Sequence, residues 1–193
     1  MNRILLASKS PRRLELITYL GVPFLAVGTS ADESFSKDLT PQENVMRAAA
    51  NKAKAAGVGR TLEKGEVLLG VDTVVVLDGE ILFKPKDYDD ARRMITKLSG
   101  KHHSVLSGVA IISTEKQLTF YESSIVEFAE MTEEEILGYI GTDEPYDKAG
   151  AYAVQGLAAK FIRRIEGCYY NIMGFPLQRI YAALRDEFHF FIS

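Results

Sequence analysis

Residues 8–13 combine a hydroxyl group, a proline and two adjacent arginines between two predicted elements. They follow the apolar run at residues 4–7 and precede apolar residues at helical spacing. Pro11 suits the first turn of a helix, and Ser10 suits the position before it. Arginine forms paired hydrogen bonds with phosphate oxygens, and the first amides of a helix attract anions. The stretch fits a phosphate-binding turn and, equally well, a capped helix with two solvated arginines.

A second candidate, Asp72, lies within the most apolar run of the chain, residues 67–77. This β-branched, near-continuous run predicts a strand that is covered on both faces. A carboxylate there must be hydrogen-bonded, paired with a cation or bound to a metal, because burying it bare is costly. Asp72 is therefore a functional candidate, with a structural ion pair as the alternative. Thr73 points to the opposite side if the strand is regular.

The dipeptide Asp78-Gly79 predicts a two-residue hairpin turn, followed by a return strand over residues 80–83. A turn this short lays the return strand along the strand that contains Asp72. Lys84 is then expected within a few residues of Asp72 across the pair. A lysine and an aspartate brought together at a strand end form a more specific signal than either residue alone.

Other polar residues are ambiguous by themselves. Asp32 and Glu33 are adjacent carboxylates in a loop, which suit a hard cation such as Mg²⁺ but also describe a solvated acidic turn. Lys52 lies on a predicted helix, where a lysine is usually a solvated charge. Residues 144–157 are rich in small residues and contain Gln155, and such a segment allows backbone to approach a ligand closely.

The elements that must position these residues alternate between strands and helices. Strands are predicted over residues 4–7, 24–27, 67–77, 80–83, 104–113, 118–129 and 161–165. Helices are predicted over residues 11–20, 41–57, 87–98, 132–141 and 174–184. We interpret residues 167–171 as a turn and expect the tail, residues 188–193, to be loose. The pattern predicts an α/β fold with a mixed, strongly twisted sheet and helices packed on it.

Composition narrows the class of protein. The chain has 193 residues, of which 47% are hydrophobic and 25% charged, with a formal net charge of −3, which argues against a broad nucleic-acid-binding face. A single cysteine, Cys168, rules out an intrachain disulfide framework and fits a reducing compartment. No apolar run reaches the roughly 20 residues that span a bilayer, and the N-terminus lacks a signal-peptide pattern. We therefore expect a cytoplasmic protein without a membrane or nucleic-acid partner.

Taken together, the motifs resemble the Maf family of nucleoside triphosphate pyrophosphatases. The matching stretches fall in family order at residues 6–13, 32–33, 52–53, 70–75, 84–86, 98–100, 147–152, 155–156 and 165–177. The resemblance covers nearly the whole chain and implies a single domain over residues 1–193. The implied fold has two lobes with a cleft between them, as in Maf and inosine triphosphate pyrophosphatase-like proteins. The family often forms homodimers, so a homodimer is expected here.

The resemblance also implies an activity, hydrolysis of a nucleoside triphosphate at the α–β phosphoanhydride with a divalent metal such as Mg²⁺ or Mn²⁺. Asp72 would be the catalytic carboxylate and proton acceptor, and Glu33 would hold the metal with it. The groups implied to bind or neutralise the phosphates are Ser8, Arg12, Arg13, Lys52 and Lys84.

Three positions distinguish subgroups of the family. This chain has Arg12, Thr73 and Gln155, which resembles the subgroup that acts on dTTP and UTP and differs from the 7-methyl-GTP subgroup. The resemblance implies that Thr73 and Gln155 also bind substrate. Gln155 can offer an acceptor and a donor to the O4/N3–H edge of a pyrimidine. Modified pyrimidine nucleotides are further candidate substrates under the same resemblance.

Some residues depart from the family pattern, and two other functions remain open. Phe83 stands where the family usually has Gly, and Cys168 and Tyr170 replace more usual serines, but none of these changes removes a candidate catalytic group. One alternative is a non-catalytic nucleotide-binding regulator of septum formation, since the family has an older link to cell-division arrest. The other is a pyrophosphatase for modified purine nucleotides. Asp72 favours an enzyme over a binder, because an acid that faces phosphates repels them.

Overall fold

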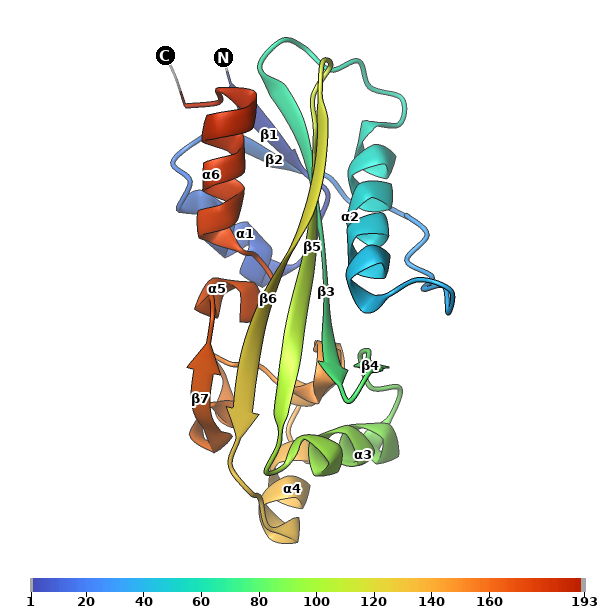
Figure 1. The fold of residues 1–193 in the computed structure, drawn as a ribbon, viewed down its shortest axis with the longest axis vertical. Coiled ribbons are helices and arrows are strands. Elements are labelled where there is room, and N and C mark those ends of the chain that lie inside the picture. Colours follow the sequence, from blue (N-terminus) through green and yellow to red (C-terminus); the bar gives the residue numbers. More distant parts are fainter. Residues whose placement is uncertain (1, 192–193) are drawn as a thin grey trace. The chain divides into compact units, whose positions relative to one another are not determined.

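The computed structural model describes residues 2–191, which contain both strands and helices (Figure 1). The strands are β1 (Arg3–Leu6), β2 (Phe24–Ala26), β3 (Glu66–Leu77), β4 (Glu80–Leu82), β5 (His102–Ile112), β6 (Gln117–Phe128) and β7 (Ile162–Glu166). The α-helices are α1 (Pro11–Thr18), α2 (Pro41–Gly57), α3 (Tyr88–Leu98), α4 (Glu133–Ile140), α5 (Tyr169–Ile172) and α6 (Leu177–Phe188). The 3₁₀ helices are η1 (Glu144–Asp147), η2 (Ala149–Ala151) and η3 (Leu157–Phe161).

The strands of this described part form one mixed sheet. Its order is β2-β1-β3-β5-β6-β7, with β4 paired to β3. β1 is parallel to both β2 and β3, whereas β4 is antiparallel to β3 and β7 is antiparallel to β6. The predicted α/β class with a mixed sheet and flanking helices is confirmed.

Local sequence signals set several element boundaries as predicted. At the start of α2, the Thr40 hydroxyl accepts from the Glu43 N–H at 3.2 Å, and the Glu43 carboxylate accepts from the Thr40 N–H at 2.8 Å. In the β3–β4 turn, Asp78 and Gly79 have φ values of 51° and 82°, the left-handed backbone that a tight hairpin requires. These short-range interactions explain why the boundaries could be read from sequence.

Two predictions were wrong. The turn expected at residues 167–171 overlaps the one-turn helix α5, which runs from Tyr169 to Ile172. The tail is ordered as far as it is described, since Phe190 is buried and its N–H donates to the Leu184 carbonyl at 3.0 Å. The Asn2 side chain also donates to the Phe190 carbonyl. Burial of a large aromatic ring holds this segment against its neighbours, and residues 192–193 of the predicted tail lie outside the described residues.

The described residues form two compact units. Unit 1 contains residues 2–72, 107–122 and 174–191, and unit 2 contains residues 73–106 and 123–173. Strands β3, β5 and β6 contribute residues to both units. Among residues 2–191, no helix combines the length and apolar character needed to cross a bilayer. The single domain and the cleft between lobes stay predictions.

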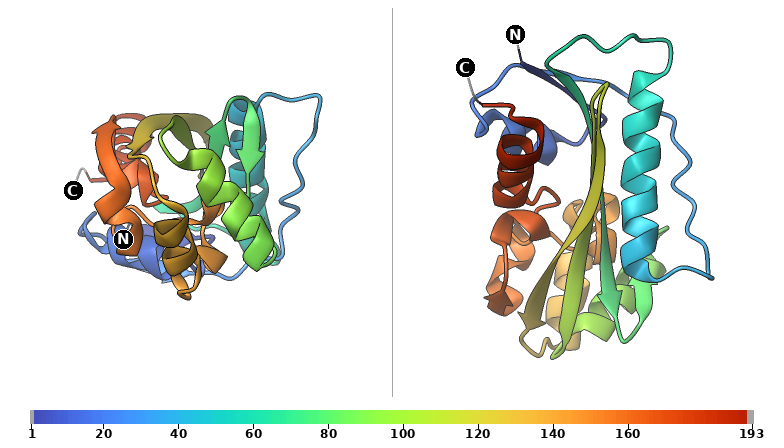
Figure 2. Two further views of the ribbon diagram at one scale, coloured as in Figure 1. Left: turned by 90° about the horizontal axis from the view of Figure 1, so that it is seen from below. Right: turned by 45° about the horizontal axis from the view of Figure 1, so that its top comes forward.

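In unit 1, α2 and α6 lie on opposite sides of the strands (Figures 1 and 2). Two glycines let α2 pack closely on β3 and β5. A Cβ atom at Gly70 would lie 2.1 Å from the Ala49 carbonyl oxygen, and one at Gly108 would lie 2.2 Å from that of Val45. No larger residue fits without moving the helix. This packing fixes the distance between β3, which carries Asp72, and α2, which carries Lys52.

The core of unit 2 contains a buried histidine among aromatic rings. His103 is 3% exposed, and its Nε2 lies 2.7 Å from the Tyr152 hydroxyl oxygen. The His103 ring meets the rings of Phe128 and Tyr152 edge to face, each at a centroid distance of 5.3 Å. Burial lowers the pKa of His103 from 6.5 to about 3, and the neighbouring His102 adds to the shift. The folded protein therefore keeps this ring neutral.

We expect this histidine to make the protein less stable in acid. Between about pH 6.5 and pH 3 the unfolded chain binds a proton at His103 that the folded chain does not. The free energy of unfolding should therefore fall by up to about 1.4 kcal/mol for each pH unit below 6.5. His103→Gln should flatten this slope in urea unfolding at pH 7 and pH 4.5. The control, His102→Gln, changes a side chain that is 66% exposed and only a secondary cause of the shift, so it should change the slope much less. Equal slopes for parent and His103→Gln would contradict the assignment.

Candidate functional site

A buried ion pair lies at the end of unit 1's part of β3. Lys52 Nζ lies 2.6 Å from Asp72 Oδ1 and 3.2 Å from Glu33 Oε1. Lys52 and Asp72 are only 8% and 7% exposed, so both charges are largely withdrawn from water. The ammonium group thus joins two carboxylates that are far apart in the sequence. Three of the predicted site residues come together here.

The loop that carries Glu33 is held in place by α2. The Asn51 side chain donates to the Asp32 carbonyl at 3.2 Å, and Arg47 donates to the Ser34 carbonyl at 2.7 Å. The Asp32 carboxylate accepts from the Ser34 N–H at 2.9 Å and closes the turn. Asp32 therefore shapes the loop, whereas Glu33 points its carboxylate at Lys52. Sequence alone had left both residues as a possible solvated turn.

Arg13 lies beside the same carboxylates and is anchored to backbone. Its Nη1 donates to the Val71 carbonyl and its Nε to the Gly174 carbonyl, both at 2.8 Å. Burial lowers the pKa of Arg13, and the nearby charges of Asp72 and Glu33 oppose that shift. The guanidinium thus fixes the backbone next to Asp72 and brings positive charge to the site. Sequence reasoning missed this anchoring role, because Gly174 lies far along the chain.

We expect Arg13→Lys to destabilise the protein. A lysine has no planar fork and cannot reproduce both hydrogen bonds. Leaving buried carbonyls without a donor should lower the free energy of unfolding by about 1–3 kcal/mol. Urea unfolding measures this loss, with Arg60→Lys, a change at an exposed arginine, as the control. Unchanged stability in Arg13→Lys would show that these hydrogen bonds contribute little.

Ser8 and Arg12 are the other two predicted site residues in unit 1. Ser8 is 9% exposed, and its hydroxyl oxygen accepts from the Ser10 N–H at 3.1 Å. Ser10 occupies the N-cap position of α1 as predicted, but its own side chain makes no capping hydrogen bond. Arg12 is partly buried, and its charge lowers the pKa of Arg13. Two cationic side chains therefore lie near each other at the start of α1.

Three predicted residues, Thr73, Lys84 and Gln155, belong to unit 2. Thr73 is partly buried in β3, whereas Lys84 and Gln155 are exposed. The hairpin pairs Val76 with Ile81 and Val75 with Leu82, as predicted, and pairing ends at Leu82, before Lys84. The predicted approach of Lys84 to Asp72 stays a prediction.

A backbone hydrogen bond joins the segment that carries Lys84 to the segment that carries Gln155. The Gly150 N–H donates to the Phe83 carbonyl at 3.0 Å. Gly150 has a φ of 68°, and a Cβ atom there would lie 2.8 Å from Val75 Cγ2. A glycine is therefore needed where this segment meets the hairpin. The departure at Phe83 thus falls at this contact.

Two carboxylates in unit 1 form a donor set that suits a divalent cation whose other ligands come from outside the protein. No group of three or more His, Cys, Asp or Glu side chains able to hold a metal occurs among residues 2–191. Mg²⁺ is commonly held by one or two carboxylates, with waters and substrate phosphates as the other ligands. Glu33 and Asp72, which converge on one Lys52 nitrogen, provide such a pair.

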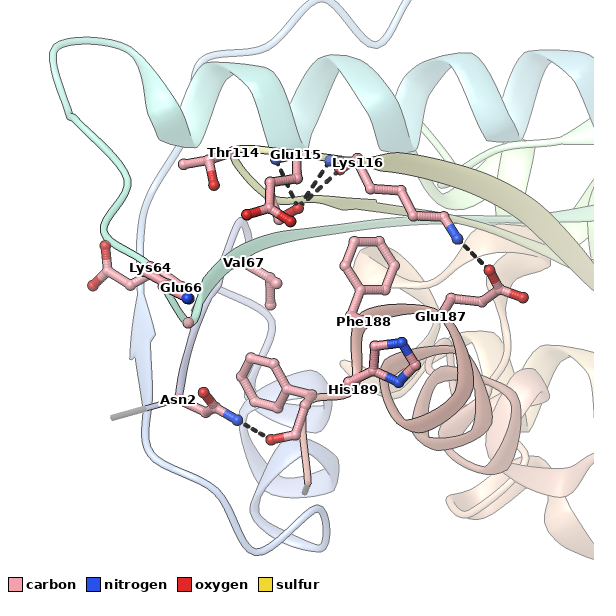
Figure 3. Close-up of a pocket in the computed structure, with 13 residues that line it drawn as sticks. Asn2, Lys64, Glu66, Val67, Thr114, Glu115, Lys116, Glu187, Phe188 and His189 are labelled. Atoms are coloured by element: carbon pink, nitrogen blue, oxygen red, sulfur yellow. Dashed lines mark hydrogen bonds and ion pairs between the residues drawn. The ribbon is translucent and has the colours of Figure 1, made fainter. Parts of the chain in front are cut away.

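Unit 1 also has a pocket of about 670 Å³ that contains none of the predicted site residues (Figure 3). It is lined by the start of β3, the β5–β6 turn and the segment that follows α6. Its walls carry both charges, for example in the ion pair between Lys116 and Glu187. This mixture of charges favours no single class of ligand.

Comparisons with known proteins show which proteins this chain is similar to. A chain from Chlorobaculum tepidum named "dTTP/UTP pyrophosphatase" is 45% identical over 191 residues, which are 97% of this chain and 96% of that one. A chain of the same name from Bacillus cytotoxicus is 46% identical over 186 residues, 96% of each. The Staphylococcus aureus Ham1 protein shares the fold, with a TM-score of 0.55 at 14% identity, over 96% of this chain and 100% of that one. A family model described as Maf-like protein matches residues 3–187, so this chain belongs to the Maf-like protein family.

Proposed function

We propose that this chain is a nucleoside triphosphate pyrophosphatase that hydrolyses dTTP and UTP to the monophosphate and pyrophosphate. The observation that carries the proposal is the buried Asp72 carboxylate, paired with Lys52 at 2.6 Å and lying beside Arg13. The names of relatives that align over nearly the whole chain support the substrate. An acid surrounded by fixed cations suits chemistry on a polyanion better than binding alone.

The cationic side chains would offset the charge of the substrate. A triphosphate carries about four negative charges at neutral pH, and phosphoryl-transfer sites balance them with Arg, Lys and metal ions. Lys52 and Arg13 bring such charge to Asp72 in unit 1. Further phosphate contacts are assigned to Ser8, Arg12 and Lys84.

Asp72 is assigned as the proton acceptor for the attacking water. Its ion pair with Lys52 fixes the carboxylate on one side, and the Arg13 anchor at Val71 fixes the backbone next to it. A divalent cation, Mg²⁺ or Mn²⁺, bound at Glu33 and Asp72 would neutralise phosphate charge and lower the pKa of a bound water. Because Lys52 contacts both carboxylates, it would share them with that cation.

Base selection is assigned to Arg12, Thr73 and Gln155. Thr73 follows the catalytic carboxylate directly in β3, so base reading and hydrolysis involve neighbouring residues. The Gln155 amide can donate to O4 and accept from N3–H of uracil or thymine. Cytosine presents the opposite pattern at these two positions and should be rejected by an amide that is held in this orientation.

A substrate panel tests the proposal. Pyrophosphate release is measured with Mg²⁺ or Mn²⁺ for dTTP, UTP, CTP and 7-methyl-GTP, with EDTA as the metal-free control. We expect dTTP and UTP to have the highest kcat/KM. Preference for 7-methyl-GTP would contradict the assignment at Arg12, Thr73 and Gln155. Binding without pyrophosphate release from any nucleotide would favour the non-catalytic regulator.

We further propose a cytoplasmic location, which the lone Cys168 supports, and small-molecule nucleotides as the natural ligands. Nucleic acids and membranes are not proposed as partners. The homodimer and the link to septum formation and cell-division arrest stay predictions of the family resemblance.

A further inference from the structure

A single carboxylate in unit 2 organises the segment that follows Gln155. Glu144 Oε2 accepts from the Leu157 N–H at 2.7 Å, and Glu144 Oε1 accepts from the Ala158 N–H at 3.2 Å. Oε1 also accepts from the Tyr139 hydroxyl at 3.0 Å. Hydrogen bonds to an ionised acceptor are stronger than those between neutral groups. We call these four residues the Glu144 cluster.

A side chain larger than that of glycine, placed between Gln155 and the cluster, would displace the Glu144 carboxylate. A Cβ atom at Gly156 would lie 2.0 Å from Glu144 Oε2 and 2.6 Å from Oε1. The backbone of Gly156 therefore lies directly against the carboxylate, and a Cβ atom there would push Glu144 away from the N–H groups of Leu157 and Ala158. The next residue towards the N-terminus, Gln155, therefore starts from a main chain whose position Glu144 fixes.

The segment before Gln155 is held by the same tyrosine. The Tyr139 hydroxyl lies 3.3 Å from the Ala151 carbonyl oxygen as well as 3.0 Å from Glu144 Oε1. One residue further on, the Tyr152 hydroxyl contacts His103 Nε2 at 2.7 Å. Supports on both sides thus fix the chain, while the Gln155 side chain itself is exposed.

We propose that Glu144 is a positioning residue for nucleotide selection and sets the orientation in which Gln155 reads the pyrimidine edge. The inference rests on the proposed role of Gln155. Glu144 acts through the backbone of residues 156–158, and it has no part in bond breaking. Discrimination between uracil and cytosine requires that the Gln155 amide stay in one orientation. An amide that can rotate or shift forms hydrogen bonds equally well with the edge of either base.

The decisive variant is Glu144→Gln. Its amide keeps the shape of the side chain, but one acceptor becomes an NH₂ group that faces N–H or O–H donors. We expect the ratio of kcat/KM for UTP to that for CTP to fall about tenfold, the equivalent of one such hydrogen bond. The kcat for UTP should change much less than this ratio. The control, Asp143→Asn, alters the adjacent exposed carboxylate and should leave the ratio unchanged.

A double mutant of Glu144 and Gln155 distinguishes a positioning role of Glu144 from a general structural effect. Gln155→Ala should lower the UTP/CTP ratio by itself, and Glu144→Gln added to Gln155→Ala should lower it no further. If Glu144→Gln does not fold, Tyr139→Phe removes one donor from the cluster, and its smaller loss of the ratio should likewise vanish with Gln155→Ala.

Two results would overturn the inference. One is a Glu144→Gln enzyme that keeps the parental UTP/CTP ratio while Gln155→Ala loses it. The other is a Glu144→Gln substitution that lowers the UTP/CTP ratio equally in the parent and in Gln155→Ala. Both outcomes leave the proposed function intact, whereas a parent protein that releases no pyrophosphate from dTTP or UTP overturns the proposed function itself.

Discussion

Asp72→Asn is expected to lower the turnover of dTTP and UTP about a thousandfold, within the range lost when a general base is removed. Asparagine has nearly the same shape but cannot accept a proton from water. Lys52 keeps its contact with Glu33 at 3.2 Å, so the buried ammonium retains a carboxylate partner. We therefore expect a folded protein whose free energy of unfolding falls by only about 1–3 kcal/mol.

Three measurements test this expectation. Pyrophosphate release gives kcat, urea unfolding gives stability, and calorimetry with the α,β-methylene analogue of dTTP gives binding. The control is Asp78→Asn, because Asp78 is an exposed aspartate in the turn after the same strand and asparagine tolerates its φ of 51°. Turnover at the parental rate in Asp72→Asn would rule out the assigned mechanism and show that another group accepts the proton.

The sequence predicted those features that depend on residues close together in the chain. The capping box of α2 needs only Thr40 and Glu43, and the hairpin register needs only Asp78-Gly79. The apolar run that became β3 also made the charge of Asp72 conspicuous, and its ion pair with a cation was one of the outcomes anticipated. The fold class followed from the same local patterns.

The details that could not be predicted depend on tertiary packing. The partner of Asp72 is Lys52 because Gly70 lets α2 lie directly on β3. The helical spacing from Val45 and Ala49 puts Lys52 on the buried face of α2 and leaves Lys54 off it, but that spacing does not identify Asp72 as the partner. In the same way, the buried Phe190 is held by hydrogen bonds to Asn2, which is distant in sequence, and to Leu184. The sequence named these residues or their segments, but it did not give their contacts.

Gly156 is a sequence signal of close packing within the chain. The composition around Gly156 predicts a small-residue segment that lets backbone approach a ligand. Its backbone instead approaches the Glu144 carboxylate of the same chain. A glycine that follows a candidate specificity residue therefore also indicates close internal packing, and a nearby acidic residue is a natural acceptor for the amides after it.

Lys52→Met should make the protein depend on a divalent cation for stability. Without the ammonium group, Asp72 is left as a buried carboxylate without its ion-pair partner, which typically costs about 3–5 kcal/mol. A methionine fills similar volume but supplies no charge. If Glu33 and Asp72 form the proposed cation site, Mg²⁺ should then compensate, and the Tm in Mg²⁺ should exceed that in EDTA by several degrees more than in the parent.

The comparison of Mg²⁺ with EDTA isolates the cation site from general damage to α2. Lys54→Met, on the same helix at an exposed position, should show the parental Tm difference. A Lys52→Met protein that is destabilised equally in Mg²⁺ and EDTA would place the cation elsewhere, whereas one with parental stability in both would show that the ion pair is not needed for folding. Mn²⁺ binding followed by electron paramagnetic resonance gives an independent readout. Tighter binding is expected in Lys52→Met, because lysine and the cation share the same two carboxylates.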